Sequence, residues 1–296
     1  MNLKVWFLET RPQFLLLSVV LAFLGTCVAN FDGAFNWWYS VLAFIGLLLC
    51  HISVNVLNDY YDYKSGIDLK TRRTPFSGGS GILPAGTLTP KQVFWFGLTC
   101  LLLAIPIGVY FVLVSGWLLL PLLIVAAICI LMYTPLLTKI GWPEWAPGVG
   151  LGALPVLGAY FVQTGEYTLP AVIASVPSGI LVHNLLLLNE FPDVEADKSA
   201  GRRTLPITLG IKGAGIFYSA LTIIMYLWII AWVAVGMMPL FCLIALLTIP
   251  FAVLAIRGAL NPNDPAKLMP ALGNNVLVVL LTQLLLGIGY ILAIVI

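Results

Sequence analysis

The sequence predicts an all-α fold, that of a polytopic membrane protein. Hydrophobic residues make up 61% of the 296 positions and charged residues only 9%, and the mean hydropathy is +1.04. Soluble domains are typically about 45–50% apolar and about 25% charged, so the composition excludes an ordinary soluble protein. No polar segment is long enough to fold separately, and we therefore expect residues 1–296 to form a single transmembrane domain.

Nine apolar stretches are about as long as a transmembrane helix, which needs roughly 20 residues to cross the hydrocarbon. The first follows Lys4 and Arg11 and is longer than the hydrophobic part of a usual signal peptide, so we interpret it as a membrane span. Prolines inside several stretches are compatible with this interpretation, because neighbouring helices satisfy the freed carbonyl groups. The predicted spans are Pro12–Ala29, Trp38–Leu57, Gln92–Val114, Trp117–Leu136, Trp145–Gln163, Leu169–Leu188, Ala214–Val235, Leu240–Ile256 and Asn275–Ile296.

The positive charges predict the orientation of these spans. With nine spans, the N-terminus and every second connection lie on one side of the membrane, and all fourteen Lys and Arg residues fall there. The opposite connections carry only Asp32 and Glu166 as charged residues. Since basic residues concentrate on the cytoplasmic side, we expect a cytoplasmic N-terminus and, in a prokaryote, an integral multi-pass protein of the cytoplasmic membrane. The net charge of +2 does not suggest nucleic-acid binding.

Two acidic motifs stand where the second and sixth spans reach the cytoplasmic side. The first runs from Asn58 to Asp68 and the second from Asn189 to Asp197, and together they hold seven of the chain's twelve acidic residues. Carboxylates at a membrane are costly and by default indicate function. The alternative is a pair of solvated loops whose charges only set the topology, but it explains two similarly built clusters poorly.

The spacing within each motif suits a cation site. Asn58 and Asp62 are four residues apart and project from one face of a helix, and Asp68 folds back toward them if the helix ends near Gly66. In the second motif a spacing of four residues repeats twice, with Pro192 expected to bend the helix or to mark its boundary. Mg²⁺ prefers oxygen ligands and is often shared between carboxylates and substrate phosphates. The predicted ligands are Asn58, Asp62, Asp68, Asn189, Asp193 and Asp197, whereas Asp59, Glu190 and Glu195 are expected to be solvated or to support the ligands indirectly.

Basic residues follow both motifs and could bind a diphosphate. A diphosphate leaving group gains negative charge as its C–O bond breaks, and metal ions with Arg or Lys side chains commonly stabilise that charge. The predicted binding residues are Lys64, Arg72, Lys198 and Arg202, together with Lys139 close after Tyr133. The positive-inside rule alone would also place these residues there.

Two histidines lie within spans close to the motifs. His51 precedes the first motif and His183 the second, each by one or two helical turns. Either could be a catalytic base, but we interpret both as hydrogen-bonded residues that pack between helices. The five cysteines are scattered through apolar stretches with no CxxC spacing, so we expect small buried side chains and no disulfides or metal ligands.

The paired motifs resemble those of the UbiA superfamily of intramembrane aromatic prenyltransferases. The resemblance rests on Asn58-xxx-Asp62-xxxxx-Asp68 and Asn189-xxx-Asp193-xxx-Asp197 and extends over nearly the whole chain; Arg11-Pro12 and Tyr133 with Lys139 also look like family features. The residues Asn58 to Asp68 are most similar to the branch that prenylates 1,4-dihydroxy-2-naphthoate in menaquinone synthesis. The resemblance implies nine helices around a central cavity that opens to lipid, with Mg²⁺ joining the motifs to a polyprenyl diphosphate. It assigns catalysis to Asp62, Asp193, Tyr133 and Lys139, and adds Arg11, Asn58 and Asn189 to the substrate-binding residues.

Three functions therefore remain to be compared. The leading hypothesis is Mg²⁺-dependent transfer of a prenyl group, through an allylic cation, to an aromatic quinone precursor such as 1,4-dihydroxy-2-naphthoate or 4-hydroxybenzoate. A second is transfer to a non-aromatic lipid acceptor such as a glycerol phosphate. A third, from another class, is a cation-coupled secondary transporter, although transporters place their ion sites near the bilayer midplane and these acids stand at one membrane edge beside basic residues.

Overall fold

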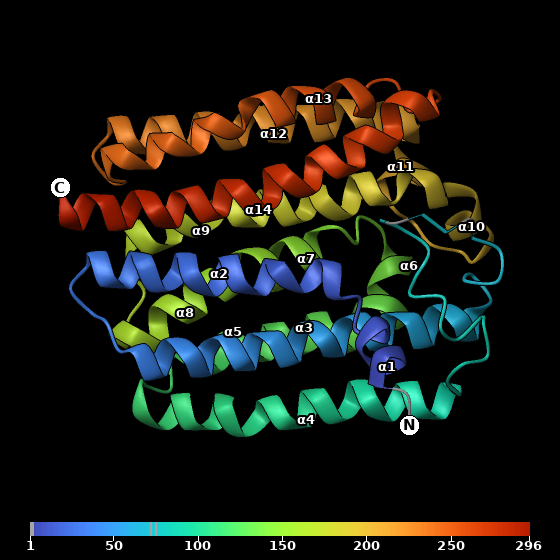
Figure 1. Ribbon diagram of the computed structural model, residues 1–296, viewed down its shortest axis with the longest axis horizontal. Helices are drawn as coiled ribbons and strands as arrows, with labels where there is room; N and C mark the ends of the chain where they lie inside the picture. Colours follow the sequence, from blue (N-terminus) through green and yellow to red (C-terminus); the bar gives the residue numbers. More distant parts are fainter. Residues whose placement is uncertain (1–2, 72, 75) are drawn as a thin grey trace.

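The computed structural model describes residues 3–71, 73–74 and 76–296 of the chain. Figure 1 shows long helices lying side by side, with α12 and α13 along one edge of the bundle and α4 along the other. In these described residues, nine helical segments are long and apolar enough to cross a membrane, which confirms the predicted all-α membrane fold. The spans are Pro12–Phe31, Trp37–Ser65, Pro90–Val114, Leu119–Ile140, Trp145–Thr164, Leu169–Ser199, Gly210–Ala234, Leu240–Ala259 and Pro265–Val295.

Several spans are built from more than one helical element. The elements are α1 (Leu3–Glu9), α2 (Pro12–Phe31), α3 (Trp37–Ser65), α4 (Pro90–Val114), α5 (Leu119–Met132), η1 (Tyr133–Leu137), α6 (Thr138–Ile140), α7 (Trp145–Gly148), η2 (Val149–Ala153), α8 (Leu154–Thr164), α9 (Leu169–Asn189), η3 (Phe191–Asp193), α10 (Val194–Ser199), α11 (Leu205–Thr208), α12 (Gly210–Ala234), η4 (Leu240–Thr248), α13 (Ile249–Ala259) and α14 (Pro265–Val295).

Some helices extend well beyond the predicted spans. The last one begins at Pro265 and not at Asn275, with Asp264 capping its first turn by accepting from the Ala266 amide at 3.1 Å. The second runs past its predicted end at Leu57 to Ser65, so the first part of the acidic motif is ordered helix. Asp264 satisfies a free amide at the start of the last helix, and Gly66 ends the second helix. Caps, and not hydrophobic length alone, therefore set where these helices begin and end.

The fourth and fifth spans each contain a π-helical turn, η1 and η2. Pro135 lies within η1 and has no amide hydrogen to donate, which favours a local widening of the helix. In η2, Gly152 packs so closely against α9 that a Cβ there would lie 2.6 Å from the carbonyl oxygen of Ser178. Such turns are frequent at functional sites, and η1 begins at Tyr133, one of the predicted catalytic residues.

The largest buried core is formed by α2, α9, α12 and α14. Leu21, Ala174, Met225 and Leu286 are all fully shielded there. By contrast, most large side chains of α4 and α5 face outward, toward the expected lipid. The main core therefore lies on one side of the bundle, and α4 and α5 on the other side present much of their surface outward.

The two histidines make hydrogen bonds within the bundle, in agreement with a packing role. His51 Nδ1 lies 2.8 Å from Ser18 Oγ. His183 Nε2 accepts from the Trp142 indole at 2.9 Å, and His183 Nδ1 lies 3.2 Å from Asn184 Oδ1. An indole N–H can only donate, so the neutral ring with its hydrogen on Nδ1 satisfies both contacts.

Helix α1 and both acidic motifs lie at one end of the bundle, and the C-terminus lies at the other (Figure 1). This is the arrangement that an odd number of spans requires. The assignment of the motif-bearing end to the cytoplasm stays a prediction from the charge distribution.

Candidate functional site

The first acidic motif is held by the last turns of α3 and the turn that ends it. Asn58 and Asp62 lie on the helix, and Asn58 Nδ2 donates to Thr134 Oγ1 of η1 at 3.0 Å. Gly66 caps the helix with φ +80°, a left-handed conformation that suits glycine. The Ile67 amide then donates back to the Asp62 carbonyl at 3.0 Å, so that Asp68 returns toward the helix as expected.

The second acidic motif has a different backbone. α9 ends at Asn189, Pro192 lies in the 3₁₀ turn η3, and Asp197 lies in the separate short helix α10. The boundary expected at Pro192 is therefore present. The spacing of four residues would place Asn189, Asp193 and Asp197 on one face of a single helix, but the proline interrupts that helix and they lie in three separate elements.

Arg202 joins the two motifs. Its Nη1 donates to Asp197 Oδ1 at 2.8 Å, and its Nη2 donates to Asp62 Oδ1. Burial alone would lower the pKa of Arg202, but the carboxylates of Asp62 and Asp197 outweigh it and raise that pKa above its ordinary value. A single guanidinium thus pairs with Asp62 and Asp197, which are 135 positions apart in the sequence. The fold therefore brings both motifs to the same end of the bundle.

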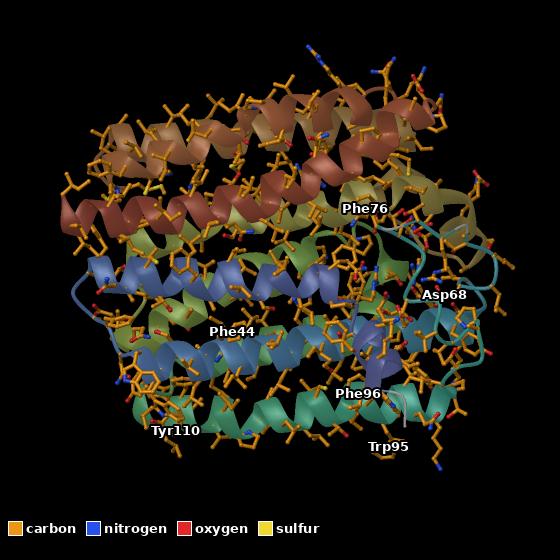
Figure 2. The ribbon with its side chains drawn as sticks, in the orientation of Figure 1. Phe44, Asp68, Phe76, Trp95, Phe96 and Tyr110 are labelled. Carbon is orange, nitrogen blue, oxygen red and sulfur yellow. The ribbon has the colours of Figure 1, made fainter. Side chains whose placement is uncertain are left out.

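All six predicted metal ligands line one cavity, which we call the polar cavity. Arg11, Tyr133 and Arg202 line it as well, as does Phe76 from the loop after the first motif. Figure 2 shows Asp68 and Phe76 at the motif-bearing end of the molecule. The predicted sites thus converge, although α3, η1, α9, η3, α10 and the loops between helices each contribute only part of the lining.

Three predicted basic residues do not line this cavity. Lys64, Lys139 and Lys198 are exposed, and Lys64 instead lies over the ring of Tyr60, 5.6 Å from its centroid. The fourth, Arg72, lies outside the described residues. Exposed lysines at a membrane edge match the positive-inside rule as well as they match a substrate site.

A layer of two buried acids lies behind the ligands of the first motif. Asp59 is only 1% exposed, which excludes the solvated role and leaves the expected alternative, indirect support of the ligands. It accepts from the Ser80 amide at 2.7 Å and lies 3.8 Å from Arg11 Nη1. Glu9, also fully buried, accepts from Ser80 Oγ at 2.8 Å. Burial, together with the nearby Asp59, raises the pKa of Glu9 to about 8. The one sequence signal for this layer was the position of Glu9 two residues before Arg11.

A second group of missed residues supports Arg202. Glu144 is fully buried and its carboxylate accepts from the Leu205 amide at 2.6 Å. The Arg203 amide donates to the Thr138 carbonyl of α6 at 2.8 Å, so the residues that follow Arg202 are held against α6 and the connection after it. Of the two roles expected for Glu190 and Glu195, solvated or indirect support, burial leaves Glu190 the second, whereas Glu195 is exposed. These contacts hold the loop that presents Arg202 to the acids.

The Gly-rich loop, residues 77–81, lines the polar cavity through Ser77, Gly78 and Gly79. Gly79 has φ +69°, and a Cβ there would lie 3.1 Å from Asp68 Oδ2 and 3.3 Å from Asp59 Oδ1. A side chain at this position would therefore press against the carboxylates. The absence of a side chain lets the loop lie directly on the acidic cluster.

The polar cavity has the chemistry, but not the ready-made geometry, of a magnesium site. Oxygen atoms of Asn189 and Asp193 are buried without a hydrogen-bond partner, and burial, with Asp62 and Asp59 close by, raises the pKa of Asp68 to about 8. These features suit the binding of a cation, and Mg²⁺ prefers oxygen donors of this kind. However, among the described residues no three His, Cys, Asp or Glu side chains are placed to hold one ion. Arg202 instead occupies the position between the motifs.

Comparisons with known proteins identify the family to which this chain is similar. The model of the UbiA prenyltransferase family matches residues 17–294. A 1,4-dihydroxy-2-naphthoate octaprenyltransferase of Bacillus subtilis (strain 168) is 31% identical over 89% of this chain and 84% of its own length. A digeranylgeranylglyceryl phosphate synthase of Thermococcus kodakarensis is 27% identical over 76% of each chain. In structure, a UbiA homolog from Archaeoglobus fulgidus bound to GPP and Mg²⁺ covers 99% of this chain and 100% of its own at 15% identity, with a TM-score of 0.60.

Proposed function

Because the chain belongs to the UbiA prenyltransferase family, we propose that it transfers a prenyl group from a polyprenyl diphosphate to 1,4-dihydroxy-2-naphthoate or a related aromatic quinone precursor, with Mg²⁺ as cofactor. The observation that carries the proposal is the convergence of both acidic motifs and Arg202 on one cavity. The octaprenyltransferase of Bacillus subtilis supports the naphthoate acceptor and a long donor. The magnesium-bound homolog from Archaeoglobus fulgidus supports the cofactor.

The polar cavity binds the charged head of the donor. Asn58, Asp62 and Asp68 from one side, and Asn189, Asp193 and Asp197 from the other, would hold Mg²⁺ in the proposed complex. When bound, the metal neutralises the diphosphate and stabilises the charge it gains on leaving. Arg11 and Arg202 line the same cavity and add donors that suit phosphate oxygens.

The exposed lysines act at a distance. Lys64, Lys139 and Lys198 lie on the motif-bearing surface and attract the anionic donor and acceptor toward the cavity. Arg72, which follows the first motif by four positions in the sequence, is proposed to share this role. Screening by salt weakens such attraction, so these residues are expected to affect KM more than kcat.

Tyr133 lies between the polar cavity and a second cavity. It lines both, and the second cavity is also lined by Asn58, Leu186 and Gly150. When the C–O bond of the donor breaks, its electron pair leaves with the diphosphate and the prenyl group becomes an allylic cation. The ring of Tyr133 can stabilise that cation through its face, until an electron-rich carbon of the acceptor ring forms the new C–C bond. That ring carbon then loses its proton to water or to the released pyrophosphate, which restores the aromatic ring.

A glycerol phosphate is the second candidate acceptor. The digeranylgeranylglyceryl phosphate synthase of Thermococcus kodakarensis supports it, at lower identity than the naphthoate relative. The transporter hypothesis is weakened, because the chain is a member of a prenyltransferase family and is an enzyme. Arg202 between the acids also suits a phosphorylated ligand better than a passing cation.

The test uses the purified protein in lipid nanodiscs with Mg²⁺ and a labelled polyprenyl diphosphate. Parallel reactions contain 1,4-dihydroxy-2-naphthoate, 4-hydroxybenzoate, a glycerol phosphate or no acceptor. We expect pyrophosphate release and a prenylated naphthoate that both disappear with EDTA. Prenylated glycerol phosphate as the main product would favour the second candidate, and no transfer to any acceptor would contradict the proposal.

A further inference from the structure

The apolar interior continues from the catalytic end toward the opposite membrane face. A cavity that we call the apolar cavity lies between α2, α3, α4, α5 and α8, and it shares Ile130, Gly150 and Leu151 with the cavity beside Tyr133. Nine of its 21 lining residues are glycine or alanine, which leaves room between the helices. The proposed donor tail therefore has a continuous apolar path away from the diphosphate.

This path is closed at its far end. Phe111, Leu119, Phe161 and Val162 form a buried hydrophobic cluster there, and Ser115 Oγ donates to the Val162 carbonyl at 2.9 Å. Along α3, the path runs from Asn58 to Ala43, which is about 22 Å at 1.5 Å per residue. An isoprene unit adds four carbon–carbon bonds of roughly 1.5 Å, or about 5 Å in extended form. The interior thus holds about four or five units, while an eight-unit tail of about 40 Å would exceed even the roughly 30 Å of hydrocarbon.

A long tail must therefore leave sideways, and the seam between α4 and α5 offers the route. A groove on the lipid-facing side of these helices shares six lining residues with the apolar cavity. The wall between groove and cavity is only one side chain thick and consists of Cys50, Ala104, Gly108, Leu123, Ala126 and Ile130. At its narrowest, a Cβ on Gly108 would lie 3.2 Å from Leu123 Cδ1.

The seam between the first span, α2, and the last span, α14, is filled by side chains, unlike the seam between α4 and α5. A Cβ on Gly287 of α14 would lie 2.5 Å from the ring of Phe23 on α2, and Phe31 packs edge-on against Tyr290 at 5.5 Å. Displacing these side chains would disturb the main core. In contrast, only Leu119, Cys129 and Ile130 of α5 are buried, so α5 can yield at low cost.

We propose that the distal isoprene units of a long donor pass between α4 and α5 into the lipid, with Gly108 and Leu123 determining which donor lengths are accepted. This inference rests on the proposed prenyl transfer. The rim of the groove is aliphatic and exposed, with Val109 and Ile124 52% and 51% accessible. Because lipid tails are as apolar as these side chains, the emerging units exchange one hydrocarbon contact for another.

Two variants that narrow this seam test the proposal. Gly108→Phe fills the wall, and Ala127→Trp fills the outer groove without reaching the apolar cavity. Val125→Trp on the same helix is the control, because Val125 faces outward and lines neither space. Naphthoate prenylation is measured with two-unit and eight-unit donors in nanodiscs.

We expect both seam variants to lower kcat/KM for the eight-unit donor by about 10-fold or more while changing the two-unit value by less than about 2-fold, with the control unchanged. Equal losses for both donors, or no loss, would overturn the seam. If the unsubstituted protein transfers neither donor, the proposed function itself fails.

A second measurement needs no substitution. An eight-unit donor with a diazirine on its terminal unit is bound to the unsubstituted protein and photolysed, and the labelled peptides are mapped by mass spectrometry. Labels on residues 101–113 and 120–127 support the seam. Labels on α2 and α14 in their place would overturn it.

Discussion

The two acidic motifs have nearly the same sequence spacing but different backbones. In the first, Asn58 and Asp62 stand on one unbroken helix and Asp68 returns through a glycine turn. In the second, Pro192 divides the residues among the end of α9, a 3₁₀ turn and α10. Both nevertheless line the same cavity. Equal spacing thus indicates a shared ligand set more reliably than it indicates a shared local structure.

The difference also divides the supporting contacts. The first motif is backed by Glu9, Asp59 and the Gly-rich loop, and the second by Glu144 and the loop that carries Arg202. Arg202 is the contact that crosses between the two sides. Substitutions in the motifs, at Arg202, at Pro192 and at Glu9 therefore separate the contributions of these parts to activity and stability.

The largest effect is expected from removing one carboxylate on each side. Asp62→Ala and Asp193→Ala should each lower turnover by about 100-fold or more, because groups that stabilise a leaving charge contribute on that scale. Pyrophosphate release measures turnover, and circular dichroism verifies that the helices persist. Glu195→Ala, in the same segment but exposed, should keep nearly normal activity. Full activity in either aspartate variant would mean that the two motifs do not form one site.

Arg202→Gln comes next. It should lower turnover by about 10-fold or more, since a buried guanidinium that pairs with two carboxylates is lost. The same variant should reach half-maximal activity at a lower Mg²⁺ concentration, because the competing positive charge between the motifs is gone. A magnesium titration of activity tests both expectations. An unchanged magnesium requirement would contradict the competition between Arg202 and the metal.

Pro192→Ala should have a moderate effect confined to the second motif. Without the proline, α9 can continue past Asn189 and carry Asp193 to another position. We expect about a 3- to 10-fold fall in kcat with little change in thermal stability. Pro177→Ala, inside α9 but away from the motif, is the matched control. Equal effects of the two substitutions would show that the interruption at Pro192 is not what places the aspartate.

The smallest effect concerns stability and pH. The pKa of Glu9 is raised to about 8, first by burial and then by Asp59. Its stabilising contribution is therefore complete below its ordinary pKa near 4.5 and is lost as pH rises through about 8. In EDTA, the melting temperature of the unsubstituted protein should fall between pH 5 and pH 9 by roughly 3 °C more than that of Glu9→Gln. Parallel pH profiles for the two proteins would show that Glu9 does not titrate in this range.

Much of the site was predictable because its signals are local. Long apolar stretches predict membrane spans. Lys and Arg residues confined to one side of the predicted membrane indicate that the two motifs lie at the same end of the bundle. Gly66 and Pro192 were expected to interrupt their helices, and both do. The six predicted ligands accordingly share a cavity, with Tyr133, Arg11 and Arg202 beside them.

The tertiary structure decided what depends on partners distant in sequence. Whether Asp59 is solvated or Lys198 enters the site depends on which neighbours cover it, and spacing cannot show that. The same holds for Glu144, whose role depends on the amide of Leu205 sixty-one residues later. Hydrophobic pattern determines which segments enter the membrane, since each residue meets that condition alone. Packing determines which side chains meet, since contact is a property of pairs.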